Sequence, residues 1–258
     1  MVSTSENKSF SGRRRVMSFR TLCLWMLGSL LVASGIVVRV VPMDGHVRLL
    51  LVLTFCVALL TGIVYFFKLL ARQPAAIFPA FFFLTLFVVW SVLGSKPPDD
   101  FMLRSVYLRQ LRSFVGVKFQ WGGESYEGID CSGLARVALW QAMLKEGVKE
   151  VNPRLLGSTL WKFWWRDVGA KDIGEGKYHY TRVIGYAPKL AGYDTSKLKT
   201  GDMAVASASH IMVYDGRGKW IEANPQDGKV VINKAAPSSK REWFNTPVTL
   251  VRWWILSN

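Results

Sequence analysis

The chain has 258 residues, with 33 basic and 18 acidic side chains and a formal net charge of +15. Half of the residues are hydrophobic, and they are concentrated in the first hundred positions, so this part of the chain differs in character from the rest. Three cysteines exclude a disulfide framework, and the mixed charges of the C-terminal part exclude a recognisable nucleic-acid module.

Residues 21–95 contain three apolar runs without a charged side chain in their centres. The runs read TLCLWMLGSLLVASGIVV, LLLVLTFCVALLTGIVYFF and AAIFPAFFFLTLFVVWSVLG. Each approaches the ~20 residues that a helix needs to cross ~30 Å of hydrocarbon. We expect three transmembrane helices, at about 21–41, 48–68 and 75–95.

A basic tail, residues 1–20, precedes the first run and contains the sequence GRRR. The positive-inside rule places this tail in the cytoplasm. Three crossings then put residue 96 and everything after it outside. If the first run is instead a cleaved signal peptide, two spans remain and the C-terminal part still lies outside. We therefore expect a multi-pass protein of the bacterial cytoplasmic (inner) membrane with an extracytoplasmic C-terminal domain.

The segment SKPPDD opens a linker at residues 96–103, because its two prolines interrupt a helix and its charges mark the return to water. A domain at residues 104–258 follows, with room for one sizeable core. Apolar periodicity predicts helices at 101–116, 131–147 and 158–168.

After residue 202 the apolar period changes from helical to alternating. MAVASA, HIMVYD, KWIEAN, KVVIN and VTLVRWWIL are predicted to form five short strands, with hairpin turns at GRG (216–218) and QDG (226–228). Helices followed by an antiparallel sheet are typical of an α+β domain.

Cys131 is the only cysteine of this domain, and it follows Asp130 at the start of a predicted helix. Burial as a small hydrophobe is one interpretation of it. The other is a nucleophile, because the N–H groups and dipole of a helix N-terminus favour a thiolate. A nucleophilic cysteine needs a general base, which is most often histidine.

Two histidines are available to such a cysteine. His179 lies in a polar stretch and is expected at the surface, whereas His210 begins a predicted strand. Glu222 and Asn224 share one face of the next strand, and a short hairpin would bring that face beside His210. Either side chain could orient the imidazole, with Glu222 as the first choice and Asn224 as the alternative.

The stretches WGGESYEGIDCSGL, LKTGDMAV and HIMVYDGRGKWIEANP resemble, in this order, the motifs of NlpC-type papain-like peptidoglycan endopeptidases. The resemblance covers roughly residues 104–256. It implies a papain-like cysteine peptidase domain in which Cys131 is the nucleophile, His210 the base and Glu222 the orienting residue. It also implies hydrolysis of amide or isopeptide bonds in peptidoglycan stem peptides through a thioester, without a cofactor or metal.

Three departures from the family pattern concern the groove and the third residue. The family's third residue is more usually His, Asn or Gln than a carboxylate. Phe119 stands where a tyrosine is frequent, and an insertion at about 148–197 lengthens the segment after Cys131. We expect substrate contacts from Asp130, Ser132, Phe119 and Trp121.

A membrane-anchored cell-wall hydrolase is the function that the sequence favours, with stem peptides and the lipid bilayer as its partners. Two alternatives stay open. A related papain-like amidase or acyltransferase would keep Cys131 and His210 but act on another substrate. A wall-binding scaffold would hold peptide in the groove without cleaving it.

Overall fold

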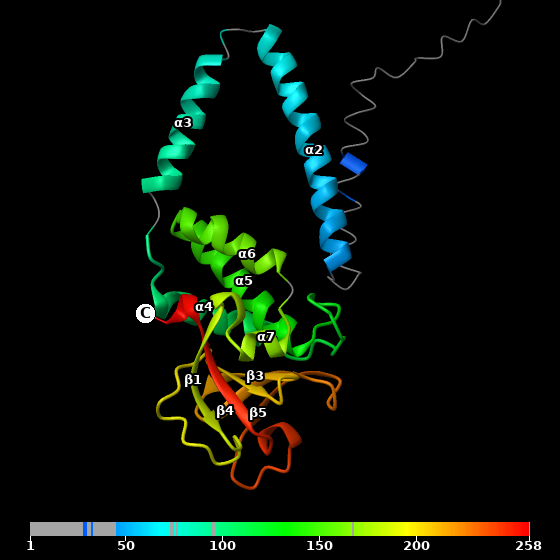
Figure 1. The fold of residues 1–258 in the computed structure, drawn as a ribbon, viewed down its shortest axis with the longest axis vertical. Coiled ribbons are helices and arrows are strands. Elements are labelled where there is room, and N and C mark those ends of the chain that lie inside the picture. Colours follow the sequence, from blue (N-terminus) through cyan, green and yellow to red (C-terminus); the bar gives the residue numbers. More distant parts are fainter. Residues whose placement is uncertain are drawn as a thin grey trace, which may run out of the picture.

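The computed structural model describes residues 28, 29, 32, 45–72, 75, 77–93, 96–166 and 168–257. The basic tail and most of the first expected span therefore lie outside the described residues. The described chain forms two apolar helices that rise from a mixed helical and β-sheet domain (Figure 1).

The two apolar helices are α2 (Gly45–Arg72) and α3 (Ile77–Leu93). Among the described residues, the one segment long and apolar enough to cross a membrane is Val47–Lys68 of α2. The 17 residues of α3 extend about 25 Å, which is short of the ~30 Å hydrocarbon core. The expectation of three spans is thus supported at one of the three segments.

Short and long helices make up the first part of the domain. Helices α4 (Asp100–Ser113) and α5 (Cys131–Lys149) confirm the first two predicted domain helices. The third predicted helix is interrupted, because a π-helical turn with a non-helical Gly157 precedes α6. The elements are α4 (Asp100–Ser113), α5 (Cys131–Lys149), η2 (Leu155–Thr159), α6 (Leu160–Trp165), α7 (Ala170–Gly174) and η3 (Lys177–His179).

The sheet has six antiparallel strands in the order β1-β6-β2-β3-β4-β5. The prediction of five strands missed β1 at the sheet edge, inside the expected insertion. Gly185 and a register shift between Val183 and Gly185 break the alternation by which the sequence would have indicated this strand. The strands are β1 (Thr181–Ala187), β2 (Met203–Ala206), β3 (His210–Gly216), β4 (Lys219–Asn224), β5 (Lys229–Lys234) and β6 (Val248–Trp253), with 3-10 turns η4 (Glu242–Phe244) and η5 (Trp254–Leu256).

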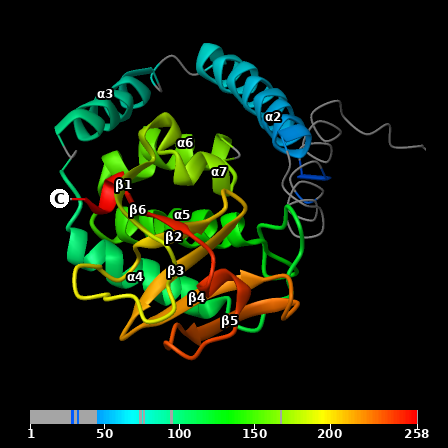
Figure 2. The ribbon, with the colours of Figure 1, turned by 60° about the horizontal axis from the view of Figure 1, so that its bottom comes forward.

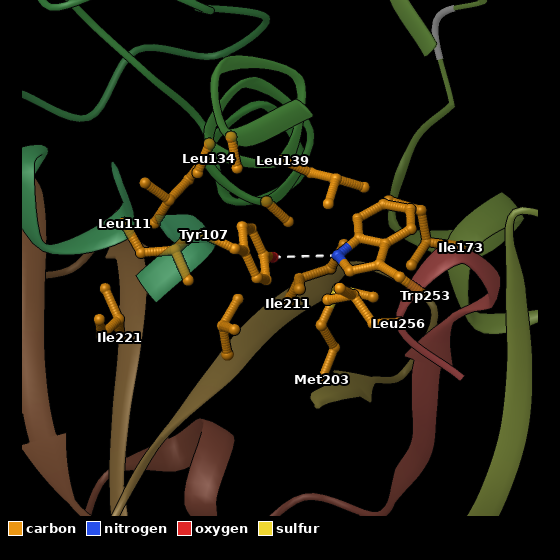
Figure 3. Packing of buried hydrophobic residues seen from close by; sticks show 14 of the residues in the cluster. Tyr107, Leu111, Leu134, Leu139, Ile173, Met203, Ile211, Ile221, Trp253 and Leu256 are labelled. Atoms are coloured by element: carbon orange, nitrogen blue, oxygen red, sulfur yellow. Dashed lines mark hydrogen bonds between the residues drawn. The ribbon is translucent and has the colours of Figure 1, made fainter. Parts of the chain in front are cut away.

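Helices α4 and α5 cover one face of this sheet and form the main core with it (Figure 3). Tyr107 of α4 is fully buried there, and its hydroxyl accepts a 3.0 Å hydrogen bond from the indole N–H of Trp253. The opposite face holds a second core around Trp220 and Phe244. The strand alternation therefore divides β3 and β4 between two cores, and it sends His210 and Glu222 to the side of Trp220.

Asp202, of the sequence stretch LKTGD, anchors the start of β2 beneath the core. Its carboxylate accepts hydrogen bonds from Nε and Nη2 of Arg252 at 2.6 and 2.7 Å, and from the backbone N–H of Lys199 at 2.8 Å. Asp202 is fully buried and Arg252 nearly so. A buried pair of this kind is costly to break, because removal of one charge leaves the other without compensation.

Asp202→Asn is accordingly expected to lower the free energy of unfolding by about 3–5 kcal/mol. Urea denaturation of the full chain in detergent, followed by tryptophan fluorescence, measures this change. Asp194→Asn is the matched control, since exposed Asp194 bonds only Ser196 and should change stability by less than about 0.5 kcal/mol. Equal effects of the two substitutions would contradict the structural role of Asp202.

Candidate active site

Cys131 occupies the first turn of α5, and Asp130 caps that helix. The Asp130 carboxylate accepts hydrogen bonds from the Gly133 N–H at 2.6 Å, the Ser132 hydroxyl at 2.9 Å and the Gly122 N–H at 2.9 Å. These contacts satisfy helix-start donors and tie the preceding loop to the same carboxylate. Asp130 thereby fixes where the sulfur of Cys131 lies.

The sulfur of Cys131 abuts the start of strand β3. Its Sγ lies 3.8 Å from the carbonyl oxygen of Ser209, and the backbone N–H of Ile211 also interacts with it. These two residues flank His210 in the sequence. The fold therefore brings the beginning of β3 against the N-terminus of α5.

His210 pairs with Glu222 in the interior. The Nε2 atom lies 2.7 Å from Oε2 of Glu222, and the two residues are only 2% and 1% exposed. With Nε2 engaged by Glu222, Nδ1 is the nitrogen left for proton exchange with a thiol. The structure thus provides the histidine with a carboxylate partner, the arrangement expected for an oriented base.

Strand register explains why Glu222 rather than Asn224 contacts the histidine. Val213 pairs with Ile221. Three residues further along this register, Asn224 would lie opposite His210, with Glu222 on the diagonal. The Asn224 side-chain oxygen instead accepts the backbone N–H groups of Gln226 and Asp227. Asn224 therefore shapes the β4–β5 turn, and the longer Glu222 side chain reaches the ring.

Two further residues contact this pair, and the sequence did not single them out. Asn233 of β5 donates a 3.2 Å hydrogen bond to Oε1 of Glu222. The indole ring of Trp243 stacks on the His210 ring, with centroids 4.5 Å apart and an interplanar angle of 20°. Pairing of the two predicted strands across the QDG turn could have indicated Asn233. Trp243 lies in no periodic segment, so no sequence pattern indicated its contact with His210.

The thiol of Cys131 is held in its neutral form by its surroundings. Burial is the main cause, and the negative charge of Asp130 adds to it, so that the pKa of Cys131 is raised to about 12. Backbone N–H groups of Ile211, Ser132 and Cys131 itself act in the opposite direction but are weaker. The backbone N–H groups at the helix start thus favour the thiolate, as the sequence predicted, but burial of the sulfur outweighs them.

Alkylation of Cys131 by iodoacetamide is therefore expected to be slow at pH 7. Because the reagent attacks the thiolate, the rate should rise about tenfold per pH unit as the pH climbs toward the raised pKa. Mass spectrometry of the Cys131 peptide at a series of pH values measures it, with the chain unfolded in guanidinium as the control. A rate that is already constant below pH 7 would show a thiolate at rest and contradict this account.

The remaining predicted site residues lie around the Cys131 turn. Trp121 is strongly exposed, and half-buried Phe119 lies beside it with ring centroids 6.1 Å apart. Ser132 is buried, with its hydroxyl on Asp130. His179 is exposed in η3, in line with the expectation of a surface histidine. Within the described ranges, no cluster of three or more His, Cys, Asp or Glu could hold a metal ion.

Comparison with known proteins identifies one family. The NlpC/P60 family model matches residues 116–247, which include Cys131, His210 and Glu222. No curated protein matches the chain.

Several solved structures are similar in part. They include the peptidoglycan hydrolase RipB of Mycobacterium tuberculosis (21% identity, 58% of this chain and 65% of that chain, TM-score 0.36), NlpC1 of Trichomonas vaginalis (16%, 58% and 44%, 0.39) and an NlpC/P60 protein of Bacillus cereus (15%, 62% and 41%, 0.38). The chain thus spans less than two thirds of each of these proteins.

Proposed function

Because the chain belongs to the NlpC/P60 family, with a papain-like α+β fold, we propose that it is a membrane-anchored cell-wall hydrolase. Its substrates are the amide or isopeptide bonds of peptidoglycan stem peptides. The observation that carries this proposal is the buried His210–Glu222 pair at 2.7 Å, on the strand whose start abuts the Cys131 sulfur. A scaffold that only bound peptide would have no use for a carboxylate-paired histidine on a strand whose start contacts a thiol.

The reaction begins with the neutral thiol. Nδ1 of His210 takes the proton of Cys131 as the sulfur attacks the substrate carbonyl, and Glu222 stabilises the imidazolium that forms. The imidazolium then gives this proton to the departing amine, which leaves a thioester on Cys131. Water, deprotonated by His210, releases the acyl group as a carboxylate and restores the thiol. Because burial raises the pKa of Cys131, we assign proton removal to the attack step.

The oxyanion of the tetrahedral intermediate needs preorganised donors. The start of α5 offers backbone N–H groups there, because Asp130 engages the N–H of Gly133 but not that of Cys131. The positive end of the helix dipole adds to their effect. We assign the backbone N–H of Cys131 to the oxyanion hole. We assign four residues near Cys131 to substrate contacts: Phe119, Trp121, Asp130 and Ser132.

The membrane part of the proposal depends on α2. Its segment Val47–Lys68 has the length and composition of a span, and its side chains are largely uncovered by the domain. We propose that the tail of residues 1–20 lies in the cytoplasm and that residues 21–95 form the membrane region. A linker follows, and residues 104–258 form the peptidase domain. In Figure 1 the domain lies at the N-terminal end of α2 and the C-terminal end of α3, so both helix ends meet it on one side. That side is assigned as extracytoplasmic.

Purified full-length protein in detergent should cleave defined stem peptides, and mass spectrometry of the products identifies the bond. The expected result is two fragments whose masses sum to the substrate plus one water. Transfer of the acyl group to another amine or alcohol would favour the acyltransferase alternative. Binding without any product would favour the scaffold alternative and overturn the proposal.

A further inference from the structure

An apolar groove of about 410 Å³ lies between α2 and the insertion helix α6. All of the residues that line it are hydrophobic except Thr54. Figures 1 and 2 show α6 on the side of the domain that faces the two apolar helices. The groove is lined by Leu51, Phe55 and Ala58 of α2, Trp140 of α5, and Trp161 and Trp164 of α6, among others.

Helix α6 exposes an aromatic cluster beside this groove. The ring of Trp161 lies 5.2 Å from that of Trp164 and 5.8 Å from that of Trp165, measured between centroids. Trp161 is 52% exposed and Trp165 39%. Phe163, on the other side of the helix, is buried and stacks on Tyr180 of the domain. The helix is thus fixed to the domain by one side and presents uncovered indoles on the other.

The position of the groove along α2 determines how deep in the bilayer the groove would lie. Its α2 residues lie between four and eleven residues after Val47, where the membrane-length segment begins. At 1.5 Å per residue this is about 6–17 Å along the helix, which reaches from the nearer part of a ~30 Å hydrocarbon core to about its middle. The Arg48–Glu124 ion pair, at 2.7 Å, holds the domain at the same end of the span. If α2 crosses the membrane, the groove and α6 lie at the level of the adjoining leaflet.

We propose that α6 is embedded in that leaflet and that the groove takes a hydrocarbon chain of a bilayer lipid. The inference rests on the membrane anchoring proposed above. Tryptophan is the residue that favours the boundary between hydrocarbon and headgroups. Lys162 and Arg166 are exposed on α6 and at its end, and their long side chains can reach anionic headgroups. The insertion therefore acts as a second anchor that holds the peptidase domain against the membrane surface.

Photo-crosslinking in membranes tests this contact. Each variant is the full-length protein with p-benzoylphenylalanine at one position, in nanodiscs of phosphatidylglycerol and phosphatidylethanolamine. After illumination the protein is digested, and mass spectrometry identifies lipid adducts. Trp161→p-benzoylphenylalanine should give a phospholipid adduct. Leu60→p-benzoylphenylalanine reports on the α2 span itself. Tyr186→p-benzoylphenylalanine is the negative control, since Tyr186 is strongly exposed in β1, in the sheet layer remote from α2 and α3 (Figure 1).

The expected result is lipid adducts at 161 and 60 and none at 186. An adduct at 60 without one at 161 would overturn the embedding of α6 and leave the anchor standing. A crosslink from 161 to another segment of the chain, or to a second copy, would also overturn it. Absence of adducts at both 60 and 161 would refute the proposed anchoring together with this inference. Trp165→p-benzoylphenylalanine provides a second position on α6 if the first variant does not fold.

Discussion

Cys131→Ala is expected to lower the rate of stem-peptide hydrolysis by a factor of about 10³ or more, because no other group can form the thioester. The loss should appear in kcat, while peptide binding persists. The rate of product formation by full-length wild type and variant, under identical conditions, measures the effect.

Cys56→Ala is the matched control for this substitution. Cys56 is a free cysteine exposed on α2, outside the domain that contains His210, and its removal should leave hydrolysis unchanged. Retention of activity by the Cys131 variant, or equal losses in the two variants, would refute the assignment of the nucleophile.

Glu222→Gln is expected to lower kcat by about 100-fold or more and to leave KM nearly unchanged. A carboxylate accepts from both His210 and Asn233 and carries the charge that stabilises the imidazolium. A glutamine has one oxygen and one NH2 group, so it cannot serve both partners and supplies no charge. Because Glu222 is buried behind the histidine, it acts as a positioning residue, and steady-state kinetics separates the two parameters.

Asn224→Ala distinguishes the two candidates for the third residue. The substitution removes two hydrogen bonds of the β4–β5 turn and should cost about 1–2 kcal/mol of stability, while kcat stays near the wild-type value. The opposite result is a kcat about 100-fold lower in Asn224→Ala and an unchanged kcat in Glu222→Gln. It would identify Asn224 as the orienting residue.

The parts of the domain that the sequence predicted are those with an unbroken period. The Cys131 helix and strands β2 to β6 were identified because apolar residues recur at 3.6 or 2.0 positions along them. Alternation on β3 and β4 also placed His210 and Glu222 on one face. The choice between Glu222 and Asn224 needed the register and the turn contacts, which depend on tertiary structure.

The parts that the sequence could not predict depend on packing. The edge strand β1 was hidden by Gly185 and a bulge, and the stacking of Trp243 on His210 comes from an irregular segment. The rise in the pKa of Cys131 was not predicted, because a helix N-terminus is visible in a sequence whereas burial of a sulfur is not. The alkylation series tests this last point.

Trapping the thioester on Cys131 is the direct test of the proposed mechanism. Full-length protein in excess over a cleavable stem peptide is quenched in acid at successive times, digested and analysed by mass spectrometry. The account predicts a transient adduct on the peptide that contains Cys131, with the mass of the acyl fragment, which decays as the carboxylate product appears. An adduct on a different residue, or products released at the same rate by Cys131→Ala, would contradict it.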